Sequence, residues 1–167
     1  MNIKLNIEKN NKDFQILEDN EVLIRGVKPK WYSQQIRFFY DNRTYEIKKK
    51  SFWSSRFQIF QSGSLIGDIP YSWKNGHHIH LHQTNKKYWI KSITKGMWTS
   101  DKTYSLLEDG IKSIIAIHYS WKKWRENIEI EIIDNNVNYE LIVYGLFLMR
   151  KKQTEESAAG SGGYVGG

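Results

Sequence analysis

The sequence predicts a mainly β protein, a closed barrel of about twelve antiparallel strands around one hydrophobic C-terminal α-helix. Three observations lead to this fold class. Between residues 2 and 133, apolar and polar residues mostly alternate, as in strands with one buried face. Turn residues interrupt this alternation at short, regular spacing. Residues 141–149 carry no charge and follow neither the strand period nor the helix period, which indicates a helix buried on every side.

The predicted strands are short segments separated by turn residues such as Asp19-Asn20 and Asp41-Asn42. Segments on either side of such a turn are expected to pair as antiparallel hairpins. The strands are expected at 3–7, 14–17, 22–27, 35–40, 44–48, 56–61, 65–69, 78–82, 87–93, 103–107, 111–117 and 127–133.

Two parts of this strand region resemble each other. Residues 71–74, Tyr-Ser-Trp-Lys, recur identically at 119–122, and Trp53-Ser54-Ser55 recurs as Trp98-Thr99-Ser100. Each copy is expected to hold four strands, so the two Tyr-Ser-Trp-Lys segments should lie at equivalent connections, at one end of the barrel. The first forty residues fit the same plan only at the level of strands, with Trp31 at the corresponding connection.

The helix is predicted at residues 137–150. Side chains alone fill barrels of about eight strands, so a wider barrel needs a central element, and a helix about 10–12 Å across fits. Asp134, Asn135 and Asn136 offer N-capping side chains. Gly145 should cost about 1 kcal/mol against alanine in mid-helix, which predicts that a side chain of the wall lies close to it. Residues 1–152 are expected to form one domain, and 153–167 a disordered Gly/Ser-rich tail.

Composition limits the possible functions only broadly. The formal charge of +7 favours an anionic partner, and the lack of cysteine excludes disulfides and thiol chemistry. The first residues show no export signal, and a membrane-spanning helix needs about 20 apolar residues, more than 141–149 supply. We therefore expect a cytoplasmic monomer without a transmembrane span, with peripheral contact to a membrane as an option.

Twelve strands in pseudo-repeats followed by one apolar helix resemble the Tubby C-terminal-like superfamily, whose smaller members are the LURP-one-related proteins and the phospholipid scramblases. The resemblance covers residues 1 to about 152 and includes the hairpin of 57–60 with 65–69, which reads Leu-Ile-Gly-Asp-Ile in its second strand. It implies a closed barrel around a central helix and, for some relatives, phosphoinositide or membrane engagement. The chain lacks a match to the basic cavity of Tubby proteins and to the acidic calcium segment of scramblases, so no residue role is transferred.

A run of histidines is the most conspicuous cluster. His78, His80 and His82 share one face of a predicted strand, and a His-x-His pair can fill two positions on a metal ion. The outer two lie about 13 Å apart at about 3.3 Å per residue, so the three cannot bind one ion. In the second copy, Glu129 and Glu131 occupy the positions of His80 and His82. We expect a solvated strand face and no cofactor, with a metal site at His78 and His80 as the alternative.

No spacing of residues points to catalysis. Most aspartates occupy turn or cap positions, and the chain has neither a nucleophile elbow nor a glycine loop of the kind that binds phosphate. We therefore expect a protein that is not an enzyme.

The tryptophan–lysine segments are the strongest functional signal. Aromatic rings beside cations suit anionic lipid headgroups or stacked single-stranded nucleic acid. Alternatively, each tryptophan plugs a barrel mouth while its lysine neighbours stay solvated. We expect a binding or interaction module for acidic lipid or another anionic ligand, with a structural or protein-interaction scaffold as the alternative and nucleic-acid binding after it. The candidate ligand-binding residues are Trp73, Lys74, Trp121, Lys122, Lys123, Trp124 and Arg125.

Overall fold

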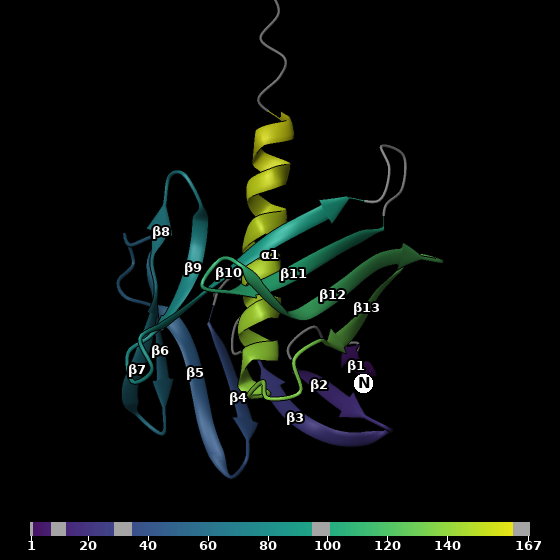
Figure 1. Ribbon diagram of the computed structural model, residues 1–167, viewed down its shortest axis with the longest axis horizontal. Coiled ribbons are helices and arrows are strands. Elements are labelled where there is room, and N and C mark those ends of the chain that lie inside the picture. Colours follow the sequence, from purple (N-terminus) through teal and green to yellow (C-terminus); the bar gives the residue numbers. More distant parts are fainter. Residues whose placement is uncertain (1, 8–12, 29–34, 95–100, 162–167) are drawn as a thin grey trace, which may run out of the picture.

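The computed structural model describes residues 2–7, 13–28, 35–94 and 101–161, which form thirteen strands and one helix (Figure 1). The helix, α1, spans Glu140–Ser161. The strands are β1 (Asn2–Ile7), β2 (Asp13–Glu18), β3 (Glu21–Val27), β4 (Ile36–Tyr40), β5 (Arg43–Lys49), β6 (Phe57–Gln61), β7 (Ser64–Ile69), β8 (Tyr71–Ser72), β9 (Gly76–Leu81), β10 (Lys86–Thr94), β11 (Lys102–Glu108), β12 (Lys112–Lys122) and β13 (Arg125–Ile132).

Each of the twelve predicted segments coincides with a strand, so the prediction of a mainly β fold with a C-terminal helix is confirmed. The thirteenth strand is β8, two residues long, which pairs only with β9. Tight turns with positive φ at Asp19-Asn20, Asp41-Asn42 and Ser62-Gly63 join consecutive strands. These short polar residues tolerate the left-handed conformation, which explains why they mark the turns in the sequence.

The strands form one antiparallel sheet that curves around α1 (Figure 1). Consecutive strands pair from β1 to β7, and β7 then pairs with β9. Strands β10 to β13 also pair in sequence order, and β13 pairs with β1. β9 pairs with β10 as well as with β7, so the two halves of the sheet meet again at β9.

The prediction of a closed barrel is wrong at this meeting point. β7 and β9 pair at Gly67↔Leu81 and Asp68↔His80, and backbone hydrogen bonds from His82 N to Ile66 O and from His78 N to Pro70 O flank these pairs. β9 and β10 pair only as far as His78↔Trp89, and then they separate. Beyond this pair, β9 joins the hairpin with β8 while β10 continues beside β11 up to Thr94. The sheet is therefore open beside the C-terminal half of α1 and does not close into a barrel.

The core lies between the concave face of the sheet and α1. All residues from 141 to 149 are buried, and inward-facing side chains of the sheet cover them. Phe57 of β6 meets Phe147 edge to face, with ring centroids 4.9 Å apart. Phe38 of β4 meets Tyr144 in the same way at 5.9 Å. The apolar run is thus buried on every side by this chain, as the sequence predicts.

The helix is longer than predicted and begins later. It starts at Glu140 and continues to Ser161, so residues 153–161, expected in a disordered tail, are helical, while 162–167 lie outside the described residues. Contacts with the sheet explain the extension. Glu155 Oε1 lies 2.8 Å from His77 Nδ1, and Lys102 Nζ donates to Glu156 Oε2 at 2.8 Å. The basic residues 150–152 consequently lie in the middle of α1 and not at its end.

The hydroxyl group of Tyr144 is a weak point of this core. It is fully buried, it has no hydrogen-bond partner among the described residues, and burial raises the pKa of Tyr144 well above its usual range. Tyr144→Phe is therefore expected to raise the free energy of unfolding by about 1 kcal/mol, because a buried hydroxyl without a partner is costly. Urea denaturation of both proteins measures this difference.

Tyr45→Phe is the matched control for this prediction. Tyr45 is equally deep in the core, but its hydroxyl accepts a hydrogen bond of 3.0 Å from Gln61 Nε2. Losing that bond should lower the free energy of unfolding by about 1 kcal/mol. A loss of stability in Tyr144→Phe of the same size would mean that the Tyr144 hydroxyl has a partner.

Candidate functional site

The two tryptophan–lysine segments lie in two separate hairpins. Trp73 and Lys74 belong to the turn between β8 and β9, and Lys123 and Trp124 form the turn between β12 and β13. The first hairpin contacts α1 at Glu155 through His77, and the second contacts it at Arg150, which donates two hydrogen bonds to Glu126.

These contacts place the two hairpins relative to each other. Residues 150 and 155 of a helix lie about 140° apart around its axis and about 7.5 Å apart along it. The hairpins therefore flank the C-terminal half of α1 from different sides, as the strands that form them do in Figure 1. The seven candidate residues do not form one site.

The β8–β9 hairpin, which carries Trp73 and Lys74, contacts the connection between β5 and β6. His77 links the two, because its Nε2 lies 3.1 Å from the carbonyl oxygen of Ser55 while its Nδ1 contacts Glu155. The His77 ring also contacts the rings of Phe57 and Tyr71, at 5.9 and 5.0 Å between centroids. One imidazole thus connects the β5–β6 loop, the β8–β9 hairpin and α1.

These two loops carry a set of exposed rings and cations that we call the aromatic patch. Its large apolar side chains are almost fully in solvent: Phe52 is 81%, Trp53 92% and Trp73 94% exposed. The rings of Phe52 and Trp53 contact each other edge to face at 4.9 Å. The patch comprises Lys49, Lys50, Phe52, Trp53, Tyr71, Trp73 and Lys74.

Sequence reasoning missed Phe52 and Trp53 as members of this site. The signal that could have identified Trp53 was present, because the repeat already grouped Trp53-Ser54-Ser55 with the tryptophan segments. Trp98, its counterpart in the second copy, and Trp31 lie outside the described residues.

Further cations lie beneath and beside the patch. The Nζ of Lys151 is 4.3 Å from the ring centroid of Phe57 and 5.4 Å from that of Phe147. Burial, followed by the nearby charge of Lys49, lowers the pKa of Lys151 to about 8. In the part of the chain that the structure describes, no ion pair joins Lys49, Lys50 or Lys74 to a carboxylate. The surroundings of the patch are therefore positively charged.

The opening in the sheet adjoins the patch. Where β9 and β10 separate, a cleft of about 580 Å³ extends down to Lys152 and Glu155 of α1. Trp73 and Lys74 line it on one side, and Trp89 and Lys91 line it from β10. The cleft thus brings together lysines from three elements, Lys74, Lys91 and Lys152, with the carboxylates of Asp109 and Glu155 beside them.

The second hairpin presents its own tryptophan. Lys123 and Trp124 have φ values of 49° and 62°, a left-handed conformation that costs free energy in residues other than glycine. This tight turn leaves Trp124 92% exposed and Trp121 half exposed, while Arg125 is also in solvent. The side chain of Lys122 lies outside the described part of the chain. This hairpin is a smaller exposed surface, separate from the aromatic patch.

His78, His80 and His82 contact neighbouring side chains, while Nδ1 of His78 is buried without a hydrogen-bond partner among the described residues. His78 stacks on Trp89 with ring centroids 5.2 Å apart, and burial lowers the pKa of His78. His80 Nε2 lies 2.9 Å from Asn85 Oδ1, and His82 Nε2 lies 2.7 Å from Asp68 Oδ2. Among the described residues, no three His, Asp or Glu side chains are grouped as metal ligands.

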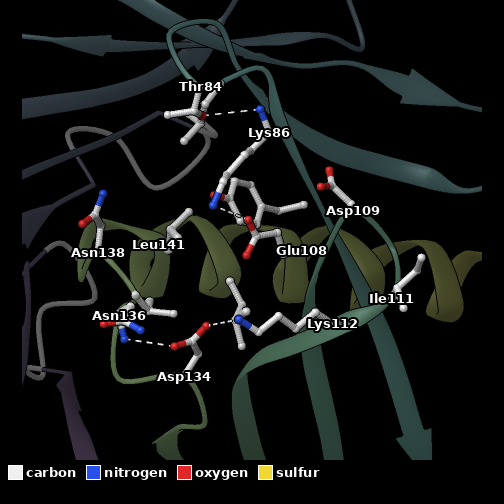
Figure 2. A pocket seen from close by; sticks show the side chains of 14 residues that line it. Thr84, Lys86, Glu108, Asp109, Ile111, Lys112, Asp134, Asn136, Asn138 and Leu141 are labelled. Carbon is white, nitrogen blue, oxygen red and sulfur yellow. Dashed lines mark hydrogen bonds and ion pairs between the residues drawn. The ribbon is translucent and has the colours of Figure 1, made fainter.

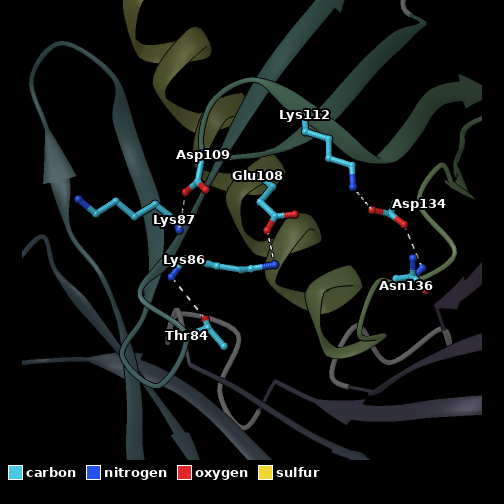
Figure 3. Close-up of polar contacts among 8 residues, drawn as sticks. All are labelled: Thr84, Lys86, Lys87, Glu108, Asp109, Lys112, Asp134 and Asn136. Carbon is cyan, nitrogen blue, oxygen red and sulfur yellow. Dashed lines mark hydrogen bonds and ion pairs between the residues drawn. The ribbon is translucent and has the colours of Figure 1, made fainter.

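A second cavity lies at the other end of α1 (Figure 2). It has a volume of about 490 Å³ and forms where the β9–β10 and β11–β12 turns meet the segment that leads into the helix. Two ion pairs, Lys86–Glu108 and Lys112–Asp134, flank it (Figure 3). None of its residues was a candidate in the sequence, because they come from three separate stretches that contain or adjoin turns.

Comparison with known proteins identifies no relative: no family model matches the chain, and no curated protein and no solved structure is similar to it. Across the described ranges, no helix combines the length and the apolar character needed to cross a bilayer.

Proposed function

We propose that this chain is a non-enzymatic binding module that attaches to anionic membrane surfaces through the aromatic patch. The observation that carries the proposal is the exposure of Phe52, Trp53 and Trp73 beside Lys49, Lys50 and Lys74 on two adjoining loops. Indole rings favour the headgroup level of a bilayer, where an apolar body and a polar N–H are both accommodated. Each lysine near an anionic leaflet adds about 1 kcal/mol of attraction.

The patch fits a membrane better than it fits a purely structural role. A tryptophan that plugged the mouth of the sheet would be buried, whereas Trp53 and Trp73 are almost fully in solvent. Large apolar side chains clustered in solvent on a monomer are uncommon away from interaction sites. Anionic lipids are concentrated in the cytoplasmic leaflet, so we propose a cytoplasmic protein that binds there peripherally, as a monomer.

We also propose a relation to the Tubby C-terminal-like superfamily, on architecture alone. One antiparallel sheet that curves around a single C-terminal apolar helix supports it. The pairing of β9 with both β7 and β10 brings the two halves of the curved sheet together, although the sheet stays open beside the C-terminal half of α1. No role of an individual residue follows from this relation.

Flotation of the full chain with lipid vesicles tests the membrane proposal. We expect the protein to float with vesicles that contain phosphatidylserine and to stay behind with vesicles of phosphatidylcholine alone. Raising the ionic strength should weaken binding without abolishing it, because salt screens the lysines but not the apolar rings. Flotation with neither vesicle would overturn the proposal. Binding to a single-stranded oligonucleotide without vesicle binding would favour the nucleic-acid alternative.

The Trp53→Ala/Trp73→Ala variant is expected to bind phosphatidylserine vesicles roughly 30- to 1,000-fold more weakly. Each ring that is half buried at the interface contributes about 1–2 kcal/mol by its apolar area. Vesicle titration measured by sedimentation gives the two affinities, and circular dichroism checks that the fold is intact.

Trp124→Ala is the matched control, since Trp124 is as exposed as Trp73 but lies in the β12–β13 hairpin. Its affinity for vesicles should change less than threefold. If Trp124→Ala or Lys123→Glu weakens binding as much as the double variant does, the site is not confined to the aromatic patch.

A further inference from the structure

We propose that the cavity beside the N-terminal end of α1 binds a small zwitterion, an α-amino acid with an apolar side chain. This inference is independent of the membrane proposal, because the cavity lies at the other end of the helix from the aromatic patch. Its volume of about 490 Å³ is within the range of about 300–1,000 Å³ that is usual for small-molecule sites.

The floor of the cavity is apolar. Tyr88 of β10, Ile114 of β12 and Leu141 of α1 line it, and each of them is at most 5% exposed. Burial raises the pKa of Tyr88 to about 12, so its ring stays neutral at physiological pH. Leu81 and Val137 extend this surface. A branched or aromatic side chain of a ligand would find an apolar surface here that is already formed.

Charged side chains of both signs line the cavity beside this floor, and the carboxylates are less exposed than the lysines. The carboxylates of Glu108 and Asp134 are mostly covered, with 18% and 16% of their side chains exposed. Their partners Lys86 and Lys112 are 47% and 62% exposed and reach in from the mouth (Figure 3). The hydrogen bond from Lys112 lowers the pKa of Asp134, which keeps that carboxylate ionised. The cavity therefore presents acceptors inside and ammonium groups at its opening.

An α-amino acid matches this arrangement in three parts. Its ammonium group can replace the ammonium group of Lys86 at Glu108 or that of Lys112 at Asp134. The lysine that is released can then bind the ligand carboxylate at the mouth. An exposed lysine–carboxylate pair contributes little free energy, so exchanging one such pair for two costs little. The hydroxyl of Thr84 and the amides of Asn136 and Asn138 also line the cavity and can complete the hydrogen bonding.

The same arrangement disfavours ligands that carry only one charge. An amine leaves the released lysine without a partner, and a carboxylic acid meets the two inner carboxylates, which repel it. A molecule without an apolar side chain leaves the accessible apolar lining, Leu81, Ile111 and Val137, in contact with water. The cavity therefore selects a ligand that carries an ammonium group, a carboxylate and an apolar side chain together, and net charge alone does not decide binding.

Titration of the full chain with leucine tests the proposal, with isoamylamine, 4-methylpentanoate and glycine as analogues that each lack one feature. We expect saturable binding of leucine with a Kd below about 1 mM, and at least tenfold weaker binding of each analogue. Amide shifts in the NMR spectrum should be confined to residues 81–88, 108–114 and 134–141. Absence of saturable binding of leucine and phenylalanine, or equal affinity for leucine and isoamylamine, would overturn it.

Glu108→Gln and Lys112→Gln test the roles of the two signs of charge. Each should weaken leucine binding at least fivefold, and urea denaturation shows whether the variant is folded. Lys74→Gln in the aromatic patch is the control and should leave leucine binding unchanged. Wild-type affinity for leucine in both cavity variants would overturn the assignment of the site. Vesicle binding by these two variants should be unaltered, which separates this result from any failure of the membrane proposal.

Discussion

A chain truncated after Asn136 is expected to accumulate as insoluble protein. Truncation removes α1, including seven buried aliphatic, methionine or phenylalanine side chains between residues 141 and 149. Burial of each contributes about 1.5–3 kcal/mol, so their loss is as large as or larger than the 5–15 kcal/mol by which a whole domain is usually stable. The concave face of the sheet, with fully buried residues such as Ile47, Ile59 and Leu106, would face water and drive aggregation.

A chain that ends at Ser157 is the control for this truncation. It keeps Glu155 and Glu156, whose contacts with His77 and Lys102 hold the C-terminal half of α1 against the sheet. We expect it to remain in the supernatant after lysis, with the circular dichroism spectrum of the full chain. A folded, monomeric fragment of residues 1–136, measured by size exclusion and circular dichroism, would show that α1 is dispensable for the sheet.

The sequence was sufficient to predict the strands and the role of α1 because those features are local. Alternation, turn residues and an apolar run can each be recognised within a few residues. The end of the helix depends instead on partners far away in the chain, since Glu155 contacts His77 and Glu156 contacts Lys102. The opening of the sheet likewise depends on how strands pair, which local sequence patterns do not reveal. Before His78, β9 pairs with the two-residue strand β8 and not with β10.

The candidate site was predicted only in part, for a geometric reason. The repeat pairs Trp73 with Trp121, and the segments that carry them belong to two hairpins, but the repeat contains no information on the curvature of the sheet. That curvature places the hairpins on different sides of α1 and brings the β5–β6 loop, which carries Phe52 and Trp53, into contact with His77 of the β8–β9 hairpin. The cavity at the other end was not predictable, because its charged residues lie in or next to turns, where polar residues are expected anyway.

Gly145→Leu is expected to lower the free energy of unfolding by about 3 kcal/mol, the cost of overpacking a full core. A Cβ atom at Gly145 would already lie 3.3 Å from Cδ1 of Ile117 and 3.6 Å from Cδ2 of Leu106. The sequence predicted such a close approach of the wall, and the structure confirms it. The larger side chain has no free volume to enter, so β11 or β12 must shift. Urea denaturation measures the effect.

Gly145→Ala separates the packing contact from the helix propensity. Alanine gains about 1 kcal/mol over glycine within a helix, while its Cβ requires Ile117 Cδ1 to move by a few tenths of an ångström. We expect these effects to offset each other to within about 1 kcal/mol. In an Ile117→Val background that methyl group is absent, so Gly145→Ala should then stabilise the protein by about 1 kcal/mol. Equal effects of Gly145→Ala in both backgrounds would show that Ile117 does not restrict this position, and that the glycine is retained for another reason.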